Sequence, residues 1–484
     1  MEKGKTPRLP TIWEALIPVI FLMVVIIICT VKLEVEPHVP ILLSAIVAAG
    51  IAMLCGHNWK SIITGILDSI GRATEALLII MIVGILIGSW VWAGTMPAMV
   101  YYGLDLISPG AFLVVGATLT GIVGLATGSS WTASGTVGVA LMGVAVGLGI
   151  DAPIAAGMVI SGAYMGDKLS PLSDSTNIAA AGAETPLYDH VRAMMTTTVP
   201  SFSLALILYG IVGVIIVDSN EYDQTLALEI QNAIQSTFYI SPWLISPVLI
   251  VIFAAIYRIP AIPSLLLAAT GGILIAIFAQ GASVGVMLEA IQYGYEADTG
   301  VEVADKLLNR GGFDSMMWTI SLIMFALSFG GILEKCGFVE VLLGGLKKRV
   351  KRPGGLVAAT IITGIACDVV LTDQYLAILV PGRMFAKTFD GMGLDRSFLS
   401  RTTEDGATLW SPMIPWNGCG AYQAATLGVS NWQFAPFAFM NLINPIYAII
   451  ITYLGIGIRY SDETKNKSYQ KKAARKAKRA EKAK

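Results

Sequence analysis

The sequence has little charge and few of the residues that build catalytic or metal centres. Charged residues make up 13% of its 484 residues, against about 25% in an average soluble protein. Only three histidines occur, His38, His57 and His190, and none stands in a zinc-binding spacing such as HExxH. The sequence also lacks a nucleotide-binding loop of the GxxxxGK type followed by Ser or Thr. The composition argues against a metalloenzyme, a Ser-His hydrolase and an ATP-driven pump, and it implies no cofactor.

Paired cysteines are missing as well. The five cysteines lie singly, mostly inside apolar stretches and without a CxxC spacing: Cys29, Cys55, Cys336, Cys367 and Cys419. We therefore expect reduced, buried cysteines with a structural role.

Long apolar runs make up most of the remaining sequence. The mean hydropathy is +0.71, and 55% of the residues are hydrophobic. A helix needs about 20 apolar residues to cross a bilayer. Several runs approach or reach this length: 15–31, 41–54, 77–91, 201–217, 265–278 and 434–454. We predict an all-α polytopic membrane protein with about 10 to 14 membrane segments.

Charged residues are segregated along the chain. Basic residues gather at the start (Lys3, Lys5 and Arg8), at 347–352 and in the tail 465–484, which holds ten Lys or Arg and one acid. The positive-inside rule predicts that these segments, and so both termini, are cytoplasmic. The acidic segments 34–36, 218–229 and 289–305 are then external. We expect the basic tail to contact anionic lipid and not nucleic acid.

The halves of the chain resemble each other. Residues 85–94 are similar to 328–337, and 148–151 to 392–395. An external linker between cytoplasmic termini requires an odd number of crossings in each half, which gives the halves opposite orientations. We predict two inverted-topology repeats with broken helices and re-entrant hairpins. The predicted segments are 1–12 (cytoplasmic N-terminus), 13–217 (repeat 1), 218–242 (external linker), 243–457 (repeat 2) and 458–484 (cytoplasmic tail).

Polar segments interrupt the apolar sequence twice in each half. Segments 166–177 and 402–418 carry carboxylates and a Ser-Pro pair, and the shorter breaks 128–135 and 368–374 precede them. Pro171 and Pro412 remove a backbone donor and disfavour helix at the preceding residue. Irregular backbone at membrane depth is tolerated only where protein or a wet cavity satisfies it. We therefore predict that the four breaks meet near the midplane and form a binding site.

The breaks offer neutral oxygens together with carboxylates, which suits a hard monovalent cation. The candidate ion- or substrate-binding residues are Asp167, Ser170, Asp174, Ser175, Thr176, Asn177, Ser130, Thr132, Ser134, Thr372, Asp373, Asp405, Ser411 and Asn417. Exchange of a cation for a proton needs a carboxylate whose pKa is brought towards neutrality by burial. The candidates for this proton coupling are Asp167, Asp174, Asp373 and Asp405.

Simpler interpretations stand beside this one. In the first alternative, residues 174–177 bind no ion and only cap the half-helix that follows them. Lys168 either neutralises Asp167 or extends its ammonium group to water. The second-half carboxylates Glu404, Asp405 and Asp373 form salt bridges in a cytoplasmic or external loop, with Arg401, Arg396 or Lys387 as partner.

The sequence resembles a known family in the first polar segment. The run Met-Gly-Asp-Lys-Leu-Ser-Pro-Leu-Ser-Asp-Ser-Thr-Asn at 165–177, with 128–138 ahead of it, is similar to the NhaC-type sodium/proton antiporters of the wider ion transporter superfamily. The likeness covers about 13–460, outside the basic tail. It implies secondary-active antiport of Na⁺ and H⁺ by alternating access across a bacterial inner membrane.

Some members of this family, the malate/lactate antiporters, also exchange a small organic acid, and the sequence leaves that alternative open. Lys168, Asn177, Asn417, Trp131 and the amide ends of half-helices would then bind the carboxylate. An ion channel is a further alternative, although a channel rarely needs two inverted broken repeats in one chain. A homodimer also remains open.

Overall fold

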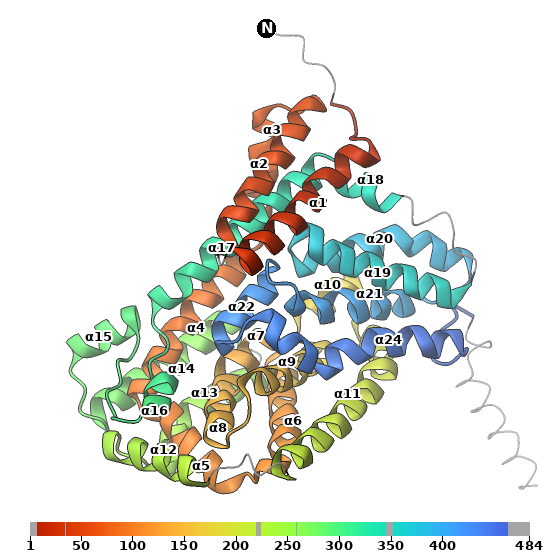
Figure 1. Ribbon diagram of the computed structural model, residues 1–484. Coiled ribbons are helices and arrows are strands. Elements are labelled where there is room, and N and C mark those ends of the chain that lie inside the picture. The colour runs from red at the N-terminus through yellow and green to blue at the C-terminus, as the bar shows by residue number, and fades with distance from the viewer. Residues whose placement is uncertain (1–6, 34, 219–223, 258, 345–351, 463–484) are drawn as a thin grey trace, which may run out of the picture.

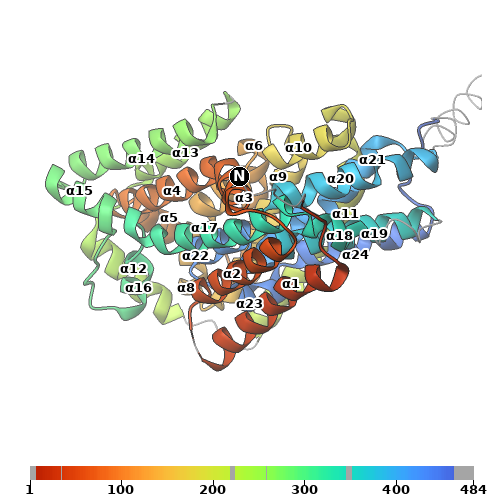
Figure 2. The same ribbon diagram turned by 90° about the horizontal axis from the view of Figure 1, so that it is seen from above.

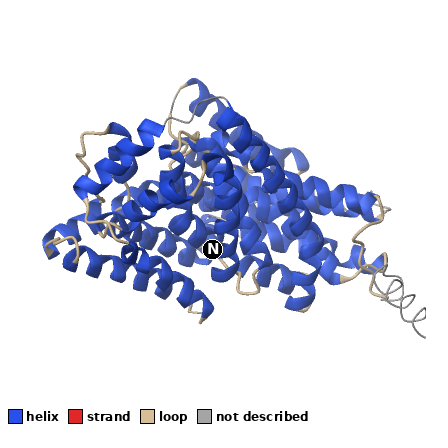
Figure 3. Ribbon diagram, turned by 90° about the horizontal axis from the view of Figure 1, so that it is seen from below, coloured by secondary structure: helices blue, strands red, loops and turns tan. Residues whose placement is uncertain are grey.

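The computed structural model describes residues 7–33, 35–218, 224–257, 259–344 and 352–462. These residues form helices joined by short loops, and within them no strand occurs apart from a single bridge between Leu394 and Tyr460 (Figure 3). The predicted all-α fold is confirmed. The five cysteines are free thiols, and all but Cys29 are buried.

The described part of the first half contains eleven α-helices. They are α1 (Ile12–Ile27), α2 (His38–Leu54), α3 (Trp59–Arg72), α4 (Thr74–Trp92), α5 (Thr95–Leu106), α6 (Pro109–Thr127), α7 (Ser130–Ala133), α8 (Val139–Gly147), α9 (Ala152–Leu169), α10 (Asp174–Gly182) and α11 (Leu187–Asp218). A π-helical turn, Ser134–Gly138, joins α7 to α8.

The described part of the second half begins inside the predicted linker, with α12 (Gln224–Thr237). The helices that follow are α13 (Ser246–Ile256), α14 (Ala261–Phe278), α15 (Val284–Tyr293), α16 (Glu302–Leu308), α17 (Phe313–Lys335), α18 (Phe338–Gly344), α19 (Pro353–Leu371), α20 (Gln374–Gly391), α21 (Arg396–Trp410), α22 (Gly418–Leu427), α23 (Asn431–Phe434) and α24 (Phe439–Tyr453). The basic segment at 347–352, except Arg352, and the basic tail lie outside the described residues.

Many of these helices are long and apolar enough to cross a bilayer. By length and composition, seven such segments occur among the described residues: α4, α6, α7 with α8, α11, α14, α17 and α19. The number rises to nine if two bent pairs each count as one span, α12 with α13 (92°) and α23 with α24 (57°). The shorter apolar helices α1 and α2 add to them. The protein is therefore polytopic, as predicted.

The two halves are interleaved. Helix α17 of the second half packs along α2, α3 and α4 of the first, while α4 also packs against α14 and α15 (Figure 1). Viewed from above, α19, α20 and α21 lie together at one end of the molecule, with α24 beside them (Figure 2). Residues that are distant in sequence therefore meet at helix crossings.

Local structure repeats between the halves at a constant spacing. A shift of 244 residues superimposes the left-handed residues that end α6 and α19, the N-caps of α9 and α21, and the N-caps of α10 and α22. Five residue pairs have this spacing. The pairs are Gly128 and Thr372, Ser129 and Asp373, Gly149 and Gly393, Asp151 and Asp395, and Ser173 and Asn417.

Close helix packing surrounds the region where the breaks lie. Helices α6 and α9 cross at glycines, because a Cβ at Gly162 or Gly166 would collide with the carbonyl oxygen of Ala117 or Gly121. Small residues at such crossings let membrane helices approach closely. Helix α21 is buried from Ser397 to Leu409 although its sequence is largely polar. A buried polar helix in a membrane protein marks a functional region.

Candidate functional site

The first Ser-Pro break separates α9 from α10, as predicted. Helix α9 ends at Leu169, Ser170 turns to an extended conformation with ψ 124°, and α10 begins at Asp174. Ser173 is the N-cap of α10. Asp167 lies in the last turn of α9, and its side chain is therefore held next to the break.

Asp167 is buried among hydroxyl groups. The residue is 5% exposed. The Ser130 hydroxyl, at the start of α7, donates to its Oδ2 at 2.8 Å, and the Ser173 hydroxyl donates to its Oδ1. The Ser173 and Ser175 hydroxyl oxygens are 2.9 Å apart, and Thr176 Oγ1 lies 3.4 Å from the Asp167 carbonyl oxygen. Within the described residues, Asp167 forms no ion pair, so its only close partners are neutral.

The other predicted residues of the first half are distributed around this centre. The Thr132 and Ser134 hydroxyls are buried and have no hydrogen-bond partner in the described structure. Asn177 donates to the carbonyl oxygens of Ser173 at 2.8 Å and Pro171 at 3.2 Å. Asp174 is exposed at the first position of α10. The capping alternative is wrong in its residues, because the N-cap is Ser173 and residues 174–177 form the first turn of α10.

Lys168 pairs with Asp405 of the second half. Its Nζ lies 2.8 Å from Asp405 Oδ1, and both side chains are fully buried. The same oxygen accepts hydrogen bonds from Thr197 Oγ1 at 2.9 Å and Asn444 Nδ2 at 2.8 Å. Both sequence-based alternatives for Lys168 are therefore wrong, because it neither neutralises Asp167 nor reaches water. Its partner is a carboxylate on α21.

Asp405 also faces a second buried cation. Arg401 Nε lies 3.4 Å from Asp405 Oδ2, and Arg401 Nη1 donates to the carbonyl oxygen of Gly457 at 3.0 Å. The guanidinium carbon stands 4.4 Å from the centre of the Phe398 ring. Two buried cations, Lys168 and Arg401, therefore face the same carboxylate.

Glu404 is buried on α21 beside a histidine that the sequence did not single out. Its Oε1 lies 3.4 Å from His190 Nε2, and His190 Nδ1 lies 2.7 Å from Ser400 Oγ. The salt-bridge alternative is wrong for Glu404, since Arg401 faces Asp405 and Arg396 pairs with Asp390 at 2.7 Å. For Asp405 the predicted partner Arg401 is correct, although the pair lies on a buried helix and not in a loop. His190 was missed because its helix, α11, lies outside the polar breaks; the only signal was a lone histidine near apolar sequence.

The second half has its own buried carboxylate at a break. Asp368, near the end of α19, accepts a hydrogen bond from Asn417 Nδ2 at 3.2 Å. Asn417 is the N-cap of α22, and Asp373 is the N-cap of α20, where its Oδ1 accepts from Leu376 N at 2.7 Å. Asp368 was not among the predicted site residues, although an acid inside an apolar run was a visible signal.

Polar and aromatic contacts tie the breaks together. Ser411 Oγ donates to Gln374 Oε1 at 3.1 Å. The Trp131 and Tyr422 rings stack with centroids 4.3 Å apart, and the Tyr422 hydroxyl donates to the Trp131 carbonyl oxygen at 2.8 Å. Since Trp131 lies on α7 and Tyr422 on α22, the first break of one half contacts the helix that follows the second break of the other.

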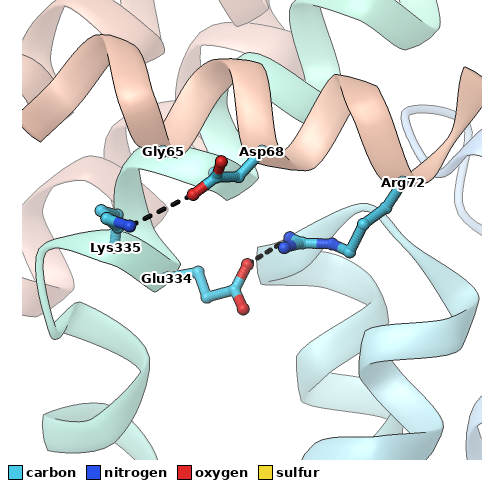
Figure 4. Close-up of a pocket in the computed structure, with 6 residues that line it drawn as sticks. Gly65, Asp68, Arg72, Glu334 and Lys335 are labelled. Carbon is cyan, nitrogen blue, oxygen red and sulfur yellow. Dashed lines mark hydrogen bonds and ion pairs between the residues drawn. The ribbon is translucent and has the colours of Figure 1, made fainter.

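A pocket of about 330 Å³ opens between α3 and α17. Figure 4 shows two ion pairs across it, Lys335 with Asp68 at 3.1 Å and Arg72 with Glu334 at 2.5 Å. All four side chains are partly exposed. Gly331 lines this pocket, and a Cβ at the neighbouring Gly330 would collide with the carbonyl oxygen of Leu371, the last residue of α19. The pocket is therefore adjacent to the second-half break.

Buried ionisable groups at helix breaks, in a polytopic all-α chain, define a membrane transporter and not an enzyme. The chain belongs to the Na⁺/H⁺ antiporter family, whose sequence profile matches residues 162–456. It is 41% identical to the Na⁺/H⁺ antiporter NhaC of Alkalihalophilus pseudofirmus, over 92% of this chain and 96% of that protein. It is 39% identical to NhaC of Bacillus subtilis, over 90% and 96%. It is also 34% identical to the malate-2H⁺/Na⁺-lactate antiporter of Bacillus subtilis, over 94% and 97%.

Proposed function

We propose that this protein exchanges Na⁺ for H⁺ across the bacterial inner membrane, and that the two ions compete for Asp167. The observation that carries this assignment is a buried carboxylate whose close partners are hydroxyl groups. The family and the names of two relatives support Na⁺ and H⁺ as the exchanged ions.

The oxygens around Asp167 are of the kind that binds a hard cation. The carboxylate is accompanied by the hydroxyls of Ser130, Ser173 and Ser175. Hydroxyl groups can turn their lone pairs towards a cation, since each has both donor and acceptor capacity. Asp167 also lies at the C-terminal end of α9, where the helix dipole favours positive charge. Na⁺ binding requires the ionised carboxylate, so a proton on Asp167 excludes Na⁺.

The other three candidate carboxylates differ from Asp167 in their surroundings. Asp405 already faces Lys168 and Arg401, which compete with any transported cation. Asp174 is exposed, and Asp373 serves as a helix N-cap. We assign them secondary roles: Asp174 and Asp373 as carboxylates on the ion path, and Asp405 as the ionic link between α9 and α21.

We further propose that 13–217 and 243–457 are inverted repeats that alternate access to the site. The residue pairs spaced 244 positions apart support this proposal, because the breaks, caps and left-handed turns recur together. The proposal includes cytoplasmic termini, in agreement with the positive-inside rule. Movement of one half against the other would then expose the midplane site to each side in turn.

A Na⁺/H⁺-coupled organic-acid exchanger is the second candidate. Arg401 is fully buried, and its Nη2 has no hydrogen-bond partner among the described residues. A guanidinium with free donors is suited to a carboxylate ligand. The similarity to the malate-2H⁺/Na⁺-lactate antiporter points in the same direction.

Transport by purified protein in proteoliposomes tests both candidates. Proton movement is recorded with a Na⁺ gradient alone, and again with malate, lactate or amino acids on either side. The first proposal predicts Na⁺-dependent proton movement without any organic solute, and loss of this movement in Asp167→Asn. Flux that appears only with one organic solute would replace it with the second candidate. An Asp167→Asn protein that exchanges at the wild-type rate would refute the site assignment.

A further inference from the structure

We propose that Asp368 anchors a second Na⁺ site, at the C-terminal end of α19. This inference rests on the proposed function and extends it, because it assigns a second cation to the same transport cycle. It starts from Asp368, which was not among the predicted site residues.

Asp368 is a fully buried carboxylate with too few partners. Its Oδ1 accepts one hydrogen bond, from Asn417 Nδ2 at 3.2 Å, and its Oδ2 accepts none in the described structure. Within the described residues, no Lys, Arg or His pairs with it. Asp373, which follows five residues later as the N-cap of α20, is a second carboxylate and not a counter-ion. An isolated buried carboxylate is costly, and a bound cation removes that cost.

Thr372 provides a second, independent indication. It is the left-handed residue that ends α19, with φ 59°, and its Oγ1 is buried without a hydrogen-bond partner. Its counterpart 244 positions earlier is Gly128, with φ 68°. Glycine adopts this conformation without steric cost, whereas a β-branched residue is strained there. A ligand bound by the threonine hydroxyl would offset the strain of having threonine, and not glycine, at this position.

The two sites share an equivalent N-cap that donates to a carboxylate. In the first half, the N-cap of α10, Ser173, donates to Asp167, and in the second half the N-cap of α22, Asn417, donates to Asp368. The carboxylates themselves come from non-equivalent helices, α9 and α19. Each carboxylate lies in the last turns of its helix, where carbonyl oxygens and the helix dipole favour a cation. The geometry at the second site therefore offers Asp368, Thr372 Oγ1 and carbonyl oxygens of α19 as ligands for Na⁺.

Equilibrium binding of radioactive Na⁺ to the purified full-length protein tests this proposal, because it counts ions independently of transport. Wild-type protein is expected to bind two Na⁺ per chain. Asp368→Asn keeps the acceptor for Asn417 and removes the charge, and it should halve the Na⁺ bound at saturation. Asp151→Asn is the matched control: Asp151 is exposed at the start of α9 and forms no side-chain cap hydrogen bond, so full binding is expected.

Thr372→Gly serves as a second variant if Asp368→Asn does not fold. Gly128 shows that the turn accepts glycine, so the backbone should be preserved, while one of the two Na⁺ affinities falls several-fold. If the wild type binds a single Na⁺ and Asp368→Asn binds the same amount, the second site is refuted and the proposed function is unaffected. Unchanged binding in Thr372→Gly would also count against the second site. If Na⁺ binding is halved as expected but no Na⁺-dependent proton movement occurs, the proposed function fails and the second site stands.

Discussion

Lys168 and Asp405 form an ion pair between the two halves of the chain, with Nζ 2.8 Å from Oδ1 and both side chains fully buried. Lys168 comes from the last turn of α9, next to Asp167, and Asp405 from the buried helix α21. The pair therefore links the helix that carries the proposed ion site to the opposite half. Any relative movement of α9 and α21 during transport has to carry this pair along or break it.

Removal of one partner of this pair should destabilise the protein strongly. Lys168→Met leaves Asp405 charged and buried with Arg401 as its nearest remaining cation, and loss of one partner of a buried pair typically costs about 3–5 kcal/mol. Thermal unfolding in detergent, monitored by size-exclusion chromatography, measures this loss of stability as a lower melting temperature. A melting temperature equal to that of the wild type would contradict the prediction.

The double variant Lys168→Met with Asp405→Asn should lose less stability than the sum of the stability losses of the two single variants. The amide oxygen introduced by Asp405→Asn can still accept from Thr197 and Asn444, and neither half then contains an unpaired charge of this pair. A double-mutant cycle isolates the interaction between neighbouring residues. If the two losses simply add, the pair is not energetically coupled and its role as a link is refuted.

Close packing of α6 and α9 leads to a prediction with an internal control. A Cβ at Gly166 would meet the carbonyl oxygen of Gly121, whereas a Cβ at Gly50 on α2 meets nothing within 4 Å. Overpacking costs about 1–3 kcal/mol, while glycine to alanine at an open helical position gains up to about 1 kcal/mol. We expect Gly166→Ala to lower the melting temperature and Gly50→Ala to hold or raise it. Equal shifts in both variants would show that the crossing is not tight.

The two aspartates of the first break should behave differently. Asp167 is buried and accepts from two serine hydroxyls, while Asp174 is exposed at the start of α10. A charge at a helix N-terminus contributes about 0.3–1 kcal/mol, so Asp174→Asn should keep most of the exchange activity that Asp167→Asn loses. Proteoliposome transport at several Na⁺ concentrations measures both. Loss of exchange in Asp174→Asn alone would reverse the assignment.

The breaks were predictable from sequence because their causes are local. Proline removes a donor, and a run of small polar residues is exceptional in apolar sequence, so the ends of α9 and α21 were located from the Ser-Pro pairs. The partner of Lys168 was not predictable in this way. It lies 237 positions away, and hydrophobic periodicity identifies a buried face without naming what packs against it.

The left-handed turn at Thr372 was unpredictable for a different reason. Threonine rarely adopts positive φ, so no propensity rule places such a turn there; only the matched position of Gly128 reveals it. His190 was equally hidden, since a lone histidine in a helix more often has a structural role. Thr372 was a predicted site residue, but its conformation, and the contact of His190 with Glu404, became visible only in the fold.

The pocket between α3 and α17 permits a test of electrostatic control over the second-half break. Arg72 and Glu334 pair at 2.5 Å and are partly exposed, and the pocket they line adjoins the break at which Asp373 caps α20. If their charges set the local potential, Arg72→Gln should strengthen the apparent affinity for Na⁺ and Glu334→Gln should weaken it. Exposed pairs contribute up to about 1 kcal/mol, which corresponds to about a two- to five-fold change in the half-saturating Na⁺ concentration.

The opposite signs are what make this test decisive, because both substitutions break the same ion pair. A purely mechanical role for the pair, as a latch between α3 and α17, would shift the Na⁺ dependence in the same direction in both variants. An electrostatic role also requires sensitivity to ionic strength, since added salt screens exposed charges beyond about 10 Å at 0.1 M. Transport should therefore be measured at low and high concentrations of an inert salt such as choline chloride. Shifts of opposite sign that shrink with added salt would establish that charge at this pocket tunes the approach of Na⁺ to Asp373.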